Sequence, residues 1–182
     1  MTNCTWPGND QLMLEYHNNE WGKALHDDQK LFEYIVLDGF QAGLSWKTIL
    51  HKRENFRKAF DNFDAEKIAL YDEDKVISLM HDTGIVRNQL KIRATIANAQ
   101  AYLRIQGEFG SFDNYIWQFT NHNTIINFPL NNAEIPVKSK ESDAMSKDLI
   151  KRGFKFVGST ICYAFMQAAG MVNDHLDGCQ YK

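Results

Sequence analysis

The chain has 182 residues, of which 44% are hydrophobic and 24% charged, and its formal net charge at pH 7 is −3. This length and composition fit one medium-sized domain, or two small lobes that share a core. No apolar run reaches the ~18 residues that span a membrane, and the N-terminus, MTNCTWPGND, lacks a signal-peptide pattern, so we expect a cytoplasmic protein with no membrane partner.

Helices are expected wherever a capping residue precedes apolar residues at helical spacing. In chain order, they are expected from Asp27 or Asp28 to about Asp38, from Trp46 to Phe60 after Ser45, after Asp64, from Asp72 to about His81, from about Arg87 to Gln106, from Ser111 or Asp113 through Phe119, from Ser139 or Ser142 to Gly153, and from about Ser159 to Ala169. Residues 121–141 are Asn-rich and predict a surface loop. No segment alternates apolar and polar residues as a strand does, so the predicted fold class is all-α.

Both ends of the chain carry residues that could bind one metal ion. Cys4 and His17 lie near the start, while His175 and Cys179 lie one helical turn apart near the end. Two thiolates and two imidazoles complete the tetrahedron of a structural zinc ion, which would tie both termini down. The alternative is a set of unrelated polar residues and a buried thiol, because the spacing is not that of a compact zinc finger. Cys162 lies in an apolar helix and is expected in the core.

Residues 79–92, LMHDTGIVRNQLKI, predict a helix, a short turn and the start of a second helix. Gly84 would permit a close backbone approach to a ligand, and free amides at a helix start bind anions. Arg87 and Lys91 follow in a stretch, 87–104, that has basic residues and no acid. This looks like a helix-hairpin-helix motif, which grips the DNA backbone without reading sequence. The alternative is an ordinary turn and a solvated helix face.

Aromatic residues gather in the first 46 residues, where Trp6, Tyr16, Trp21 and Trp46 accompany Asp38. Core packing is one explanation. The other is a pocket for a planar base, because aromatic faces stack on bases and attract cations. A carboxylate at the edge of such a pocket can accept a hydrogen bond from an exocyclic amine.

Four long stretches carry a resemblance to a known family: YHNNEWG (16–22), QAGLSWKTILHKREN (41–55), TGIVRNQLKI (83–92) and KRGFKFVGSTICYAFMQAAGMVNDH (151–175). They resemble 3-methyladenine DNA glycosylase I, of the helix-hairpin-helix glycosylase superfamily, over nearly the whole chain. The resemblance implies a monomer that removes 3-methyladenine from double-stranded alkylated DNA and holds one structural zinc ion. It also implies a single unit, 1–182, with a hairpin lobe at about 46–120 and a zinc-tied lobe at about 1–45 and 121–182.

The resemblance also implies site residues. The family's zinc ligands correspond to Cys4, His17, His175 and Cys179. Its base pocket corresponds to the residues Trp6, Met13, Tyr16, Asp38 and Trp46. The pocket carboxylate, usually Glu in the family, is the catalytic candidate Asp38, and Met13 stands where well-known members have Tyr.

DNA contacts are expected from the hairpin and from the loop 41–46. Gly84, Arg87 and Lys91 would contact phosphates, while Gly43 would permit close approach and Leu44 would fill the space that a flipped base leaves. The alternative for Leu44 is ordinary core packing.

Methylation at N3 makes adenine cationic, so the base leaves as a neutral group and needs no general acid. Residues 85–107 indeed contain no Asp or Glu. We therefore expect an anionic, aromatic pocket that holds the flipped base while water attacks the sugar, with 7-methylguanine, which is also cationic, excluded by shape. Two alternatives stay open: a non-catalytic binder of damaged DNA, and a zinc hydrolase with an open coordination position.

Overall fold

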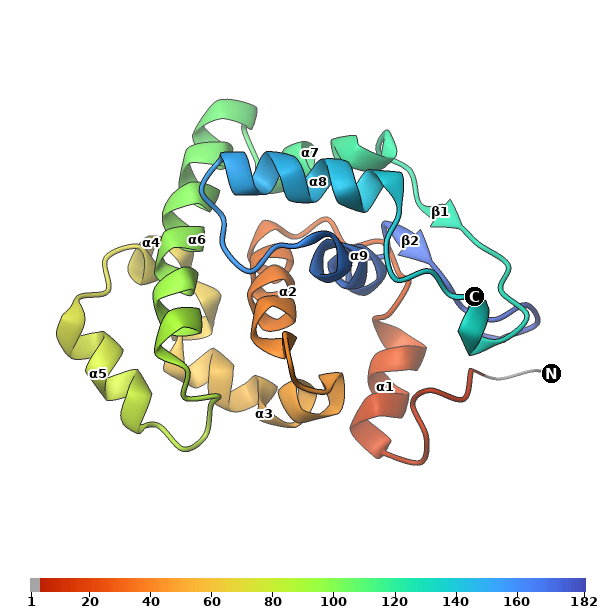
Figure 1. The fold of residues 1–182 in the computed structure, drawn as a ribbon, viewed down its shortest axis with the longest axis horizontal. Helices are drawn as coiled ribbons and strands as arrows, with labels where there is room; N and C mark the ends of the chain where they lie inside the picture. The colour runs from red at the N-terminus through yellow and green to blue at the C-terminus, as the bar shows by residue number, and fades with distance from the viewer. Residues whose placement is uncertain (1–3) are drawn as a thin grey trace.

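The computed structural model describes residues 4–182, and almost every helix in it begins at a side chain that caps it. Figure 1 shows how these helices are arranged. The helices are α1 (Gln11–Asn19), α2 (Asp28–Gln41), α3 (Trp46–Ala59), α4 (Ala65–Ile68), α5 (Glu73–His81), α6 (Gln89–Phe109), α7 (Phe112–Trp117), α8 (Lys140–Lys151) and α9 (Ser159–Ala168). In α1 to α8 an Asp, Asn or Ser side chain accepts a hydrogen bond from the first turn. Each such cap stabilises its helix by about 1 kcal/mol.

The predicted helical class is confirmed, with three differences in the elements. Helix α1 was not expected, and it begins at the cap Asp10. Helix α2 continues through Gly39, because burial of Phe40 and its neighbours outweighs the roughly 1 kcal/mol that a glycine costs inside a helix. Helix α6 begins only after the cap Asn88, so Arg87 lies in the loop before it.

A two-residue parallel pairing joins distant parts of the chain. Strand β1 (Ile125–Ile126) lies in the predicted loop 121–141, and strand β2 (Val172–Asn173) follows α9. The same loop contains the 3-10 turn η3 (Asn132–Glu134), while η1 (Asp61–Phe63) and η2 (Gln118–Thr120) are similar turns elsewhere. Within residues 4–182, no helix is long and apolar enough to cross a membrane.

Helix α2 forms the centre of the core, packed against α3, α6 and α9 (Figure 1). All residues from 31 to 40 are buried. Two of them, Glu33 and Asp38, are acids. Burying a carboxylate is costly unless it is paired and hydrogen-bonded, so the surroundings of these two residues decide what each contributes.

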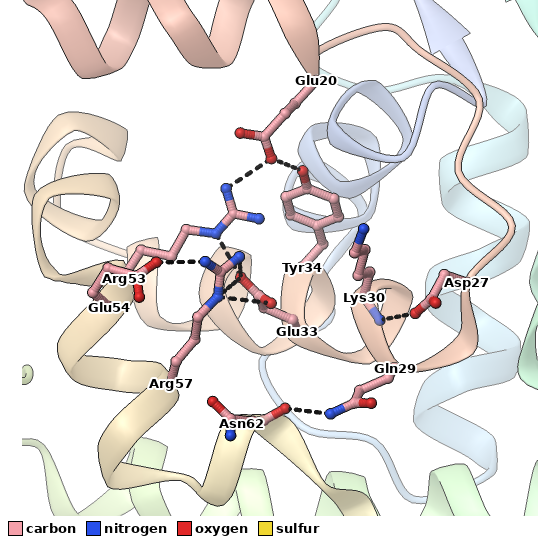
Figure 2. A network of polar contacts seen from close by, with 10 residues as sticks. All are labelled: Glu20, Asp27, Gln29, Lys30, Glu33, Tyr34, Arg53, Glu54, Arg57 and Asn62. Atoms are coloured by element: carbon pink, nitrogen blue, oxygen red, sulfur yellow. Dashed lines mark hydrogen bonds and ion pairs between the residues drawn. The ribbon is translucent and has the colours of Figure 1, made fainter.

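Glu33 is paired by arginines of α3 (Figure 2). Arg53 Nε lies 2.5 Å and Arg57 Nη2 2.8 Å from Glu33 Oε1. Arg53 also donates to Glu20, at 2.7 Å, and Tyr34 donates to the same carboxylate oxygen. The network therefore links α2 and α3 to the chain that follows α1.

Arg53→Met is expected to lower the free energy of unfolding by about 3 kcal/mol, because the buried Glu33 would keep only Arg57 and Glu20 would lose its arginine partner. The measurement is urea unfolding followed by circular dichroism. Arg93→Met is the matched control: Arg93 also pairs with a carboxylate, Glu73, at 2.6 Å, but both side chains are exposed, so its effect should stay under about 1 kcal/mol. Equal effects of the two variants would contradict this account.

Candidate active site

A cavity of about 370 Å³ lies between the buried end of α2 and the helices around it. This volume is within the usual range for small-molecule sites. Its lining residues come from α1 to α3, from the segments just before and after α1, from the loop around η3 and from α9: Trp6, Tyr16, Trp21, Asp38, Gln41, Trp46, Asn132, Ile135, Pro136, Val137, Thr160, Tyr163, Ala164 and Gln167. The structure thus brings together four of the five residues predicted for the base pocket.

Aromatic rings form one side of this cavity. The Tyr16 ring lies 5.1 Å from Trp46 and 6.4 Å from Trp6, and Trp6 lies 5.0 Å from Trp21, measured between ring centroids. The rings are tilted or edge-to-face, which is the favourable arrangement for aromatic neighbours. Flat hydrophobic faces of this kind suit a planar heterocycle.

Three buried polar atoms have no hydrogen-bond partner among residues 4–182, and all belong to residues that line the cavity. They are Trp6 Nε1, Trp46 Nε1 and Asp38 Oδ2. Each such atom costs about 1–3 kcal/mol when left unsatisfied. Two indole donors and one carboxyl oxygen are therefore available to a ligand.

Asp38 is 2% exposed, and its burial raises the pKa of the carboxyl well above its ordinary value. Burial also raises the pKa of Tyr16, and the negative charge of Asp38 adds to that effect. In the part of the chain that the structure describes, no arginine or lysine offsets the burial of Asp38 as Arg53 does for Glu33. A cationic ligand would supply the missing positive charge and favour the ionised carboxylate.

Asp38→Asn is expected to raise the free energy of unfolding at pH 7. The folded protein binds this proton more tightly than the unfolded chain, so the carboxyl destabilises the fold increasingly as pH rises from about 4 through the folded pKa. The gain in the free energy of unfolding from Asp38→Asn should thus be absent near pH 3. At pH values above the folded pKa, the gain should level off at about 1.4 kcal/mol for each unit by which the folded pKa exceeds the unfolded pKa. Urea unfolding at several pH values measures it.

The control for that experiment is Asp174→Asn. Asp174 is also fully buried, but its carboxylate accepts three hydrogen bonds. This variant should lower the free energy of unfolding at pH 7. An Asp38→Asn variant that is destabilised, or whose advantage does not change with pH, would contradict the assignment of an unpaired buried carboxyl.

The structure places Met13 outside the cavity, which corrects the sequence prediction for this residue. Met13 is buried in the hydrophobic core, and its backbone N–H donates to the cap Asp10. The sequence analysis also missed lining residues on α9. Tyr163 and Gln167 lie four residues apart, so they share one face of an otherwise apolar helix, and that spacing is the pattern that could have identified them.

The loop 41–46 presents Leu44 to solvent, with 43% of the residue exposed. The Leu44 N–H donates to Gln41 O at 2.6 Å, and Gly43 has a φ of 79°. This is a tight turn that favours glycine at its third position. Leu44 is therefore not a core residue, and Gly43 is needed for its backbone conformation. Nothing lies within 4 Å of where a Gly43 Cβ would be.

Gly84 is packed against protein in the turn between α5 and α6. Its N–H donates to Asp82 Oδ1 at 2.7 Å, and its carbonyl accepts from Lys52 Nζ at 3.2 Å. A Cβ at this position would lie 2.9 Å from Asp82 Oδ1. The close approach at Gly84 is thus to its own chain. Arg87 is exposed in the same loop.

Lys91 does not lie on the surface with Arg87, which differs from the sequence expectation. It is 7% exposed, and its ammonium donates to Phe40 O at 2.8 Å and to Ala42 O at 2.6 Å. Burial lowers the pKa of Lys91. A cation near a helix C-terminus satisfies its free carbonyls, so Lys91 holds the end of α2 and the turn that carries Leu44.

Three of the four predicted metal ligands meet in one buried cluster. The ligand atoms of Cys4, His17 and Cys179 lie within 4.8 Å of one another, and Cys179 Sγ is 3.9 Å from His17 Nε2. A tetrahedral zinc ion would separate such a sulfur and nitrogen by about 3.6 Å. His17 Nδ1 lies 2.7 Å from Asn18 Oδ1. That contact favours a proton on Nδ1 and leaves Nε2 free for a metal.

His175 lies beside this cluster but is not part of it. Its ring centroid is 4.7 Å from that of His17, and its Nδ1 is 2.8 Å from Asn173 Oδ1. Burial lowers the pKa of His175 to about 4 and also lowers that of His17. Both imidazoles are therefore neutral, which is the form that binds metals. Burial raises the pKa of Cys4 to about 11, so a metal would displace its proton on binding.

Comparisons of the sequence with known proteins all identify the same family. A family model described as methyladenine glycosylase matches residues 6–182. The chain is 50% identical to DNA-3-methyladenine glycosylase 1 of Escherichia coli (strain K12), over 98% of this chain and 96% of that protein. It is 46% identical to DNA-3-methyladenine glycosylase of Haemophilus influenzae, over 100% of this chain and 98% of that protein.

Solved structures agree with these sequence relatives. A crystal structure of 3-methyladenine DNA glycosylase I superposes with a TM-score of 0.96 at 48% identity, covering 98% of each chain. A structure of the Staphylococcus aureus enzyme, determined for its recognition of 3-methyladenine, superposes with a TM-score of 0.96 at 34% identity, covering 100% of this chain and 97% of that one.

Proposed function

The chain belongs to the methyladenine glycosylase family, and from that premise we infer that it hydrolyses the N-glycosidic bond of 3-methyladenine in alkylated DNA. Relatives at 46% and 50% identity over nearly their full lengths carry this activity in their names. The observation that supports it most strongly here is the unpartnered carboxyl of Asp38, buried in an aromatic cavity. A flat, cationic base is the ligand that such a site would hold best.

The proposed mechanism uses binding in place of acid catalysis. The base must leave the helical stack, at a cost of a few kcal/mol, and the cavity between Tyr16, Trp46 and Asp38 would receive it. N3-methyladenine carries a positive charge and departs as a neutral base, so no residue needs to protonate it. Asp38 would contact the cationic base, while water attacks the sugar carbon. Neutral adenine would gain less from the same contacts, which gives selectivity.

Release of free 3-methyladenine from methylated DNA, measured by chromatography, tests this function. Wild type should release the base, and Asp38→Asn should be slower by about 100-fold, because a hydrogen bond to a charged group contributes about 1.5–3 kcal/mol. Asp113→Asn is the control and should match wild type, because the Asp113 carboxyl lies on α7, outside the cavity, and is paired with His26 at 2.8 Å.

Two outcomes would contradict these statements separately. A wild-type protein that binds methylated DNA without releasing base would be the non-catalytic binder of damaged DNA. A fully active Asp38→Asn variant would leave the activity intact but remove the role given to Asp38.

We propose that duplex DNA is held by the loop between α5 and α6, as in a helix-hairpin-helix motif. The exposed Arg87 and the first-turn amides of α6, which have no acceptor within the helix, would contact phosphate oxygens. Leu44 would enter the space that the flipped base leaves, since it is exposed on a turn between the lining residues Gln41 and Trp46. Lys91 would act indirectly, by holding that turn.

We also propose that Cys4, His17 and Cys179, with His175 beside them, hold one structural zinc ion. The donor types, the 3.9 Å separation of Cys179 Sγ and His17 Nε2, and the neutral imidazoles support this. With His175 as the fourth ligand, no position would be left for a reacting water. Zinc would thus fasten the two ends of the chain together, and the reading as a zinc hydrolase is not favoured.

Cys179→Ser is expected to lose close to one equivalent of zinc and to unfold at a lower temperature, because structural zinc contributes on the order of 10 kcal/mol to folding. Metal content by mass spectrometry and thermal unfolding are the measurements. Cys162→Ser is the control: its thiol is equally buried but donates to Val157 O, so zinc should be retained. A Cys179→Ser variant that keeps one equivalent of zinc would refute a structural site. A variant that releases the base more slowly but unfolds at the wild-type temperature would also refute it.

We also propose that the protein is a cytoplasmic monomer built of two lobes. A monomer fits a protein that must leave one face open to DNA, and the cytoplasm is where such a repair activity would meet its substrate. The division into a hairpin lobe (about 46–120) and a zinc-tied lobe (about 1–45 and 121–182) is proposed on the same basis, because the candidate ligands lie in the outer two segments.

A further inference from the structure

Helix α9 forms the wall of the cavity through Thr160, Tyr163, Ala164 and Gln167. Its two longest polar side chains are bound to the same carboxylate. Tyr163 donates from Oη to Asp174 Oδ2 at 2.8 Å, and Gln167 donates from Nε2 to the same oxygen at 2.7 Å. Asp174 itself is not a lining residue. It lies behind the wall, directly after β2.

Asp174 is fully buried, and its other oxygen accepts a hydrogen bond from Asn127 Nδ2 at 2.7 Å. An ionised carboxylate can only accept hydrogen bonds. It therefore fixes the side-chain amide of Gln167 with its NH2 group toward Asp174, and it takes the hydroxyl proton of Tyr163. Tyr163 therefore keeps no hydroxyl donor for the cavity. Gln167 has one of its two N–H groups bound by Asp174, which leaves its carbonyl oxygen on the opposite side of the amide.

The α9 wall consequently offers hydrogen-bond acceptors. Gln167 has its carbonyl oxygen left, and Tyr163 has a lone pair on its hydroxyl oxygen. The unpartnered donors of the cavity, Trp6 Nε1 and Trp46 Nε1, belong to residues outside α9. A purine with an exocyclic amine can donate to an acceptor wall, whereas an oxo group at the same ring position would face two acceptors.

We propose that Asp174 is a positioning residue that sets the hydrogen-bond polarity of the α9 wall, and that Gln167 is thereby a specificity-determining residue for purines with an amine, in place of an oxo group, at C6. This rests on the proposed function. Positive charge alone cannot distinguish 3-methyladenine from 7-methylguanine, because both are cationic in DNA. The α9 wall could distinguish them, because 7-methylguanine carries an oxo group in place of the amine. Sites built to hydrogen-bond a group reject analogues that lack it strongly, since their own buried polar atoms are then left unpaired.

The test compares two free bases that differ in the group at C6: 3-methyladenine and 3-methylhypoxanthine, in which an oxo group replaces the amine. Binding is followed by quenching of tryptophan fluorescence. Wild type should prefer 3-methyladenine by about tenfold or more, and Gln167→Leu should reduce this preference by about three- to tenfold, as expected for one hydrogen bond. A side chain that only filled space would weaken both bases equally.

Gln106→Leu is the matched control. Gln106 also donates from Nε2 to a carboxylate, Asp28, at 2.7 Å, but it does not line this cavity. Its preference should equal that of wild type. Asp174→Asn would let the amide of Gln167 turn over, because Asn can donate as well as accept, and the preference should fall here too. If that variant fails to fold, Gln167→Leu decides alone.

The outcomes separate this inference from the proposed function. A wild-type protein that binds neither base would remove the proposed function, and this inference with it. A wild type that binds 3-methyladenine, with an unchanged preference in Gln167→Leu, would overturn the inference and leave the proposed function in place.

Discussion

The central constraint on this molecule is the burial of two carboxyl groups in one helix, α2. Glu33 is compensated within the protein, because Arg53 and Arg57 of α3 both donate to it. Asp38, five residues further along, has an unpartnered buried oxygen and a raised pKa. Because burying an uncompensated charge is unfavourable, Asp38 costs the fold stability. Such a cost is typical of a group kept for a ligand, and the ligand proposed here carries the compensating charge.

Several long-range contacts keep that end of α2 in place. Lys91 of α6 donates to the last carbonyls of α2 and so links the position of Asp38 to the turn that exposes Leu44. On the other side of the cavity, the segment after α9 carries Asp174, which orients the wall, and His175, which lies beside the candidate zinc cluster. A zinc ion that fastens this segment would therefore also stabilise the cavity, without taking part in the chemistry.

Local chemistry explains what the sequence could predict. Caps such as Ser45 and Asp72 act within three residues, so their helices were expected at the observed positions. The candidate metal ligands were identifiable because few other roles need those residue types together, and the candidate base pocket because of the family resemblance. The role of Lys91 was not predictable, since its partner Phe40 lies 51 residues away along the chain. The role of Asp174 was not predictable either, because it lies beyond the end of α9, where helical spacing no longer relates it to Tyr163 and Gln167, and because Asn127 lies 47 residues away. Met13 was assigned by resemblance alone, and packing placed it in the core.

The two buried aspartates, Asp38 in the cavity and Asp174 behind its wall, differ in how their hydrogen bonds are satisfied. Together they account for both parts of the proposed selectivity. Asp38 is left unsatisfied, so it favours a ligand by charge, and an alkylated purine gains more than a normal one. Asp174 is fully satisfied, so it acts through the side chains it orients, and the polarity of that wall favours adenine over guanine.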